Sequence, residues 1–216
     1  MKCSSKNMLR IAGGLVVAGL MVAGQAGAAD TSTTGSQLSS KDTSFLKEAS
    51  TGNQAEITLA QMAQQKAQNP EVKNLAQMIE QDHQQAQQKL QTIAQANGVT
   101  LEEKPTFSQR RTQSKLEKLS GADFDQQYAK DMIEDHVSDI KKFQKASEKL
   151  ENSDLKQYAQ ETLPTLQKHL ETAKSAAKSA GVDEATISSL TKNMPAMGGT
   201  GENGESSHGM GGQQRY

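Results

Sequence analysis

Four long stretches of this 216-residue chain repeat small apolar residues every three or four positions, the period of an α-helix. They cover residues 42–68, 70–97, 123–150 and 154–180. Alanine and glutamine dominate them, whereas aromatic residues make up 3% of the chain and tryptophan is absent. Alanine and glutamine favour helices, while strands favour β-branched and aromatic residues. The pattern therefore predicts an all-α protein and argues against a sandwich, a barrel or a doubly wound sheet.

The breaks between these helices indicate how they connect. Asn69 and Pro70 suit the cap and the first position of a helix, and Asn152 makes a similar short break. The connection over 98–122 is long enough to run back along a bundle, with a short helix expected over 108–119. Two hairpins joined by one long crossover are typical of a ferritin-like four-helix bundle. We expect this bundle over 42–182, followed by a short C-terminal helix over 183–193.

The two expected hairpins are similar in sequence. Residues 69–77 align with residues 152–160 at an offset of 83, and the same offset places Gly98 on Gly181. An internal repeat of this kind indicates two related structural units, which supports the bundle. The alternative is a chance similarity between helices rich in alanine, glutamine and lysine.

The first 28 residues have the layout of a secretory signal peptide. Basic residues precede a 14-residue apolar stretch over 11–24, and small residues follow at 26–28. We expect export to the periplasm with cleavage after Ala28 or Ala29, and no stable membrane insertion after cleavage, because this stretch is short for a membrane span. An uncleaved anchor is the alternative. Association with the outer membrane is compatible with this prediction.

Cleavage would remove the one cysteine, Cys3, and leave a net charge of −4. This charge does not favour nucleic acid as a partner. The basic side chains of the crossover are expected to form a solvated face, with weak contact to an anionic envelope surface as the alternative.

Both ends lack helical periodicity. Residues 29–41 are rich in serine, threonine and glycine, and residues 194–216 are rich in glycine with scattered methionine. Such compositions are typical of disordered segments, so we expect a flexible lead-in and a disordered tail. Soft Cu(I) ligands such as Met197 and His208 occur in the tail, but their loose spacing favours a flexible segment.

Each long helix carries one polar residue on its apolar stripe, near mid-length: Glu56, His83, His136 and His169. At about 1.5 Å per residue, the first two lie about 20 Å from the break at Asn69. The other two lie about 25 Å from the break at the opposite end of a bundle about 42 Å long. These levels nearly coincide, so the four side chains are expected to converge in one layer.

A carboxylate and three imidazoles can bind one transition metal ion such as Fe, Zn or Cu. Glu80 precedes His83 by one turn, in the Glu-x-x-His spacing of di-metal bundles, and Asp139 follows His136 by one turn. The candidate metal ligands are therefore Glu56, Glu80, His83, His136, Asp139 and His169.

Two alternatives to a metal site stay open. The layer can be a metal-free network in which the Glu and His side chains hydrogen-bond one another, or some of these side chains can face solvent. Asp82 and Asp135, each next to a His, are expected to face outward or cap a neighbour.

Six segments of the chain resemble the bacterial family called domain of unknown function 4142. The segments are residues 45–49, 52–56, 72–76 with 82–83, 119–124, 132–136 and 163–170. The resemblance covers about residues 42–182. It implies a ferritin-like fold and an exported or outer-membrane location, but no established activity. The wider di-iron pattern matches only in part, because the repeat places Leu163 and Leu166 where the fourth helix should supply Glu and His.

These observations predict an exported helical-bundle protein that binds a transition metal in its core, with a role in stress protection. The alternative is a non-enzymatic envelope interaction or structural protein with a metal-free polar layer. An enzyme is not favoured, and a di-metal oxidoreductase is the weaker hypothesis because of the two leucines.

Overall fold

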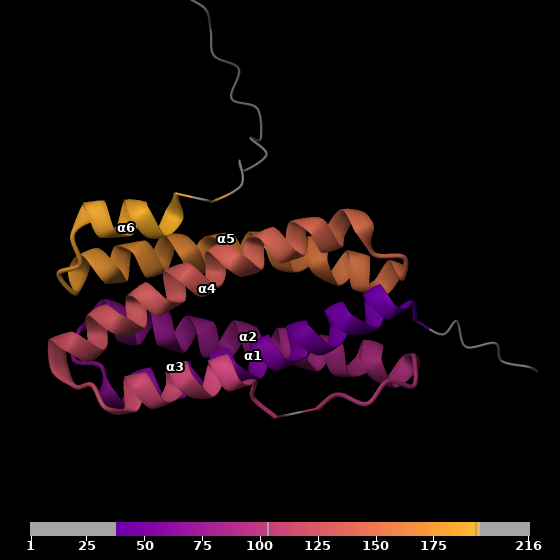
Figure 1. Cartoon of the computed structure of the whole chain (residues 1–216), viewed down its shortest axis with the longest axis horizontal. Coiled ribbons are helices and arrows are strands. Elements are labelled where there is room, and N and C mark those ends of the chain that lie inside the picture. The colour runs from indigo at the N-terminus through magenta and orange to yellow at the C-terminus, as the bar shows by residue number, and fades with distance from the viewer. Residues whose placement is uncertain (1–37, 103, 193, 195–216) are drawn as a thin grey trace, which may run out of the picture. The chain divides into compact units, whose positions relative to one another are not determined.

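The computed structural model describes residues 38–102, 104–192 and 194, and this part of the chain is all helical (Figure 1). The helices are α1 (Ser40–Lys66), α2 (Pro70–Ala96), α3 (Phe107–Glu117), α4 (Gly121–Lys149), α5 (Ser153–Ser179) and α6 (Glu184–Thr191). None of the helices in the described residues combines the length and the apolar character that a membrane crossing requires. The predicted signal peptide and nearly all of the predicted tail lie outside the described residues.

Capping side chains explain where the helices begin. The Asn69 side-chain oxygen accepts hydrogen bonds from Glu71 N and Val72 N, and Pro70 is the first residue of α2. The Ser39 hydroxyl caps α1, which begins two residues earlier than expected. The last two residues of the predicted lead-in over 29–41 are therefore helical. Thr106 and Gln109 form a capping box at the start of α3.

The long helices form two hairpins, α1 with α2 and α4 with α5 (Figure 1). The hairpins meet mainly along α2 and α5, a boundary called here the α2–α5 seam. The opposite boundary, the α1–α4 seam, is packed less closely, and α3 contributes to its cover. Helix α6 packs against α4 and α5.

Two aspartates join the hairpins at equivalent points. Asp125 of α4 accepts backbone hydrogen bonds in the turn between α1 and α2, at 2.8 Å from Asn69 N. Asp42 of α1 does the same in the turn between α4 and α5, at 3.0 Å from Glu151 N. Both aspartates are buried. Their positions differ by 83, the offset of the internal repeat, so the repeat has a structural counterpart.

Small residues make up much of the core between these helices. Fully buried alanines occur on all four long helices, including Ala60, Ala76, Ala129 and Ala159. Alanine has little side-chain volume, so facing helices approach closely where it lies between them. Larger side chains such as Phe124 fill the remaining volume.

Candidate metal centre

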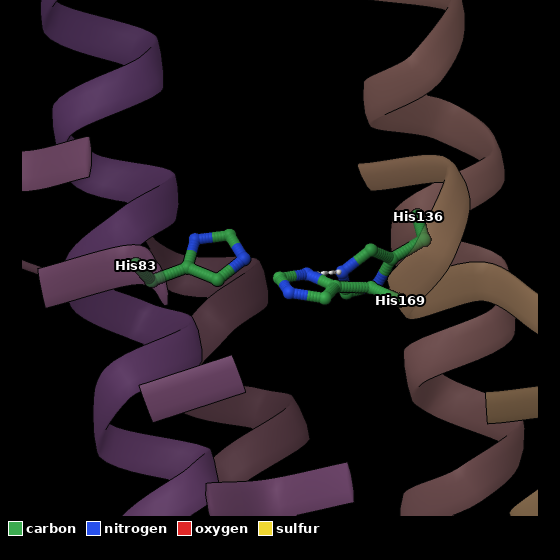
Figure 2. A group of neighbouring side chains, drawn as sticks. All are labelled: His83, His136 and His169. Atoms are coloured by element: carbon green, nitrogen blue, oxygen red, sulfur yellow. Dashed lines mark hydrogen bonds between the residues drawn. The ribbon is translucent and has the colours of Figure 1, made fainter. Parts of the chain in front are cut away.

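Three histidines from three helices lie together in the core (Figure 2). His83 comes from α2, His136 from α4 and His169 from α5, and their rings point toward one another. One nitrogen of each ring lies within 4.8 Å of the corresponding nitrogens of the other two. All three side chains are buried, with 4% of His83 exposed and none of His136 or His169.

Glu56 of α1 completes this group. Its Oε2 lies 3.1 Å from His83 Nε2 and 3.5 Å from His136 Nε2. His136 Nε2 in turn lies 3.1 Å from His169 Nδ1. The structure therefore brings together the four side chains that interrupt the four apolar stripes, one from each long helix.

Each imidazole uses its remaining nitrogen to bond an oxygen that can only accept. The pairs are His83 Nδ1 with Asn53 Oδ1 at 2.9 Å, His136 Nδ1 with the Met132 carbonyl at 2.8 Å, and His169 Nε2 with Asp82 Oδ2 at 2.9 Å. The ring nitrogen must donate in each pair, so it carries the proton. In a neutral imidazole the other nitrogen then holds a lone pair. When all three rings are neutral, three lone pairs therefore face one another and the Glu56 carboxylate.

The Asn53 amide belongs to a buried hydrogen-bond network. Its Nδ2 donates to Gln87 Oε1 and to the Tyr158 hydroxyl, at 3.4 and 3.3 Å. Gln87 Nε2 in turn donates to the Ser50 hydroxyl at 2.9 Å. In this arrangement the amide oxygen of Asn53 faces His83, which then presents N–H at Nδ1.

The electrostatics of the group require a positive charge near Glu56. Burial acts to raise the pKa of Glu56, but the charges of His136 and His83 outweigh it and hold this pKa well below its usual range. Burial likewise acts to lower the pKa of His83, but the Glu56 charge raises it above 6.5. Burial and the His136 charge lower the pKa of His169 to about 4. Either protons or a metal ion can supply the positive charge.

Three of the six separations between the ligand atoms fit one tetrahedral ion. A metal 2.0–2.1 Å from nitrogen and oxygen ligands separates neighbouring ligand atoms in a tetrahedron by about 3.4 Å. The distances within the group are 3.1, 3.1 and 3.5 Å. Glu56 Oε2 and His83 Nε2 are buried, and their contact of 3.1 Å is favourable only when they share a proton or a metal ion. The partners of the outer nitrogens, a carboxylate and two carbonyl oxygens, are those that metal-bound imidazoles use.

The sequence model of the family described as "Domain of unknown function (DUF4142)" matches residues 27–176. The chain belongs to this family. The match confirms the resemblance found in the sequence. No curated protein and no solved structure matches the chain. The family description assigns no activity to this DUF4142 protein, so a function must be argued from its own side chains.

Two further candidate ligands lie outside the central group of this DUF4142 protein. The Glu80 carboxylate accepts hydrogen bonds from Gln61 of α1 and Gln84 of α2, at 2.8 and 3.1 Å. Asp139 accepts a bond of 3.0 Å from Lys142 Nζ, and burial and the Glu56 charge raise the pKa of Asp139. Neither carboxylate belongs to the set of converging nitrogen and oxygen atoms.

The sequence analysis missed the residues that orient the histidines. Asn53 lies one turn before Glu56 and Gln87 one turn after His83, and both are buried polar side chains. A buried polar residue one turn from another is the signal that could have found them. Asp82 caps the neighbouring His169, with 30% of its side chain exposed.

Two cavities border the group. The larger, about 440 Å³, lies along the α1–α4 seam and reaches Glu56 and His83. Asp135 and Asp139 of α4 line it, and side chains of α3 cover it. The smaller, about 90 Å³, lies on the α2–α5 seam beside Asp82 and His169.

Proposed function

We propose that this DUF4142 protein is an exported, ferritin-like four-helix bundle that binds one transition metal ion through Glu56, His83, His136 and His169. One observation carries the proposal: all three outer ring nitrogens bond oxygen acceptors, so neutral rings direct three lone pairs to one place beside a carboxylate. A metal-free layer would instead need protons at the inner contacts of 3.1 Å, which join His136 to His169 and Glu56 to His83.

The ferritin-like arrangement is supported by the two related hairpins. A long crossover separates them, and Asp42 and Asp125 occupy equivalent capping positions. Export is supported by the basic, apolar and small-residue pattern of the first 28 residues.

The donor set favours Zn²⁺ as the first ion to test. Three imidazole nitrogens and one carboxylate oxygen in tetrahedral spacing suit Zn²⁺, whereas Cu²⁺ prefers tetragonal geometry. Fe²⁺ accepts the same donors and is the second ion to test.

Metal analysis of the protein purified from the periplasm without chelators tests this proposal. We expect about one metal ion per chain, because four ligand atoms surround one position. The His83→Ala and His136→Ala variants should lose it, and His208→Ala, which changes the one other histidine of the chain, should keep it.

Thermal unfolding of the metal-free protein supplies the second readout. A bound ion must stabilise the folded state, so the melting temperature should rise with added Zn²⁺ or Fe²⁺. A wild-type protein that carries no metal and gains no stability from Zn²⁺, Fe²⁺ or Cu²⁺ would contradict the proposal and favour the metal-free polar layer. Circular dichroism of the two alanine variants separates loss of ligand from loss of fold.

A further inference from the structure

The cavity on the α1–α4 seam is larger than metal binding alone requires. At about 440 Å³ it falls within the size range of small-molecule sites. It reaches the Glu56–His83 edge of the centre, and these two side chains are the ones with slight exposure, 4% each. Phe45 and Phe143 line its wall with their rings 5.2 Å apart. An organic molecule would therefore meet an apolar surface on the way to polar atoms.

Gly52 explains why this space stays open. It lies inside α1 and lines the cavity. Glycine is unfavourable in a helix interior relative to alanine, so such a position calls for a reason. Close approach of another helix is not the reason, because a Cβ built on Gly52 meets no atom within 4 Å. A longer side chain at this position would project into the cavity.

Acidic side chains outnumber basic ones in the lining of the cavity. Glu48, Asp135 and Asp139 line it together with Glu56. Lys142 pairs with Asp139 at 3.0 Å. Within the described part of the chain, neither Glu48 nor Asp135 has a basic side chain at ion-pair distance. Lys47 also lines the cavity, so its lining holds four carboxyl groups and two amines, and this excess of acidic groups disfavours a negatively charged ligand.

We propose that the cavity binds a small uncharged or cationic organic molecule next to the Glu56–His83 edge of the centre, and that Gly52 keeps the cavity open for it. The contact of this molecule with a metal ion rests on the proposed function. The cavity itself does not, so the two can fail separately.

The test uses imidazole as an uncharged or cationic probe and azide as an anionic one. Protein loaded with Co²⁺ reports contact with the metal through its visible absorption. The metal-free protein reports occupancy through the amide NMR signals of Ala49, Gly52 and Ala55, which line the cavity. We expect imidazole to change both signals saturably and azide to bind at least tenfold more weakly.

The Gly52→Leu variant places a side chain in the cavity without altering a metal ligand. It should weaken imidazole binding at least tenfold while Co²⁺ content stays the same. Gln65→Leu adds the same side chain at an exposed position of α1 and should bind imidazole as the wild type does. Replacing Asp135 and Asp139 with Asn should reduce the difference in binding affinity between imidazole and azide.

Each contrary outcome has a distinct meaning. A wild-type protein whose amide signals do not respond to imidazole, or a Gly52→Leu variant that binds it unchanged, would overturn the cavity proposal. Azide binding tighter than imidazole would overturn its charge selectivity. A protein that takes up no Co²⁺ while its amide signals respond to imidazole would refute the metal centre and leave the ligand cavity standing.

Discussion

The two seams between the hairpins border the same four side chains but differ in how they close. The α2–α5 seam is bridged by the His169–Asp82 bond of 2.9 Å and by the Lys89–Glu161 pair at 3.2 Å, and its cavity measures about 90 Å³. The α1–α4 seam holds a cavity of about 440 Å³ under α3. Under the proposed function this difference divides the roles: the α2–α5 seam would orient the metal ligand His169, and the α1–α4 seam would give access to the centre.

The internal repeat shows how one centre arises from two related halves. Asp42 and Asp125 make the same contacts in the two turns, as the offset of 83 requires. The same offset relates Glu56 to Asp139 but His83 to Leu166. The second half therefore offers a carboxylate without its imidazole. This asymmetry is compatible with the proposed single ion, for which the first half would supply Glu56 and His83 and the second half His136 and His169.

The largest loss of metal affinity is expected at His136, which contacts ligands from both seams. His136 is fully buried and lies within 3.5 Å of both Glu56 and His169. His136→Ala should weaken metal binding about 100-fold or more, because losing a ligand costs more than losing a ligand's hydrogen-bond partner. Competition with a chelator measures this. Binding within threefold of the wild type would show that the two seams do not share an ion.

The role of the α2–α5 seam can be tested through the Asp82 carboxylate. Asp82→Ala removes the acceptor that orients His169 and should weaken metal binding about 10- to 100-fold. Asp135→Ala is the matched control, since Asp135 also precedes a histidine but lies in the cavity and makes no bond to an imidazole ring in the described structure. Equal losses in the two variants would contradict a special role for the α2–α5 seam.

Lowering the pH should protonate His83 and His169 at different pH values. Burial acts to lower the pKa of His83, but the Glu56 charge raises it above 6.5, so an incoming metal must displace a proton there below that pKa. Metal affinity should then fall about tenfold per pH unit as the pH decreases. Burial and the His136 charge lower the pKa of His169 to about 4, so it should add a second proton only near that pH.

Isothermal titration across this pH range measures the slope. Glu56→Gln removes the charge that raises the pKa of His83, and it should shift the onset of the decline to lower pH. An affinity that does not change between about pH 8 and pH 5 would exclude imidazole ligands, because a metal cannot bind a protonated ring.

Periodicity and capping residues made the helices predictable from sequence. The expected boundaries of the long helices agree with the structure to within two residues, because Asn69, Asn152 and Gly181 act locally. The level of the four polar side chains also followed from helix rise alone. Periodicity and helix rise could not predict where the Glu80 side chain points. Its one-turn spacing from His83 matches a ligand motif, but its carboxylate accepts hydrogen bonds from glutamines of α1 and α2. Side-chain direction between paired helices depends on packing, which a single sequence does not reveal.

The smallest expected effect is on the stability of the metal-free protein at the α1–α4 seam. Gly52 has helical geometry and empty space at its Cβ, so Gly52→Ala should raise the free energy of unfolding by about 0.5–1 kcal/mol. Gly181→Ala is the opposite case, because its φ of 90° is strained for any side chain, and it should lower stability by about 1 kcal/mol. Urea unfolding measures both changes. A destabilised Gly52→Ala would mean that α3 or α4 already packs against this part of α1, and the contrast between the two seams would then disappear.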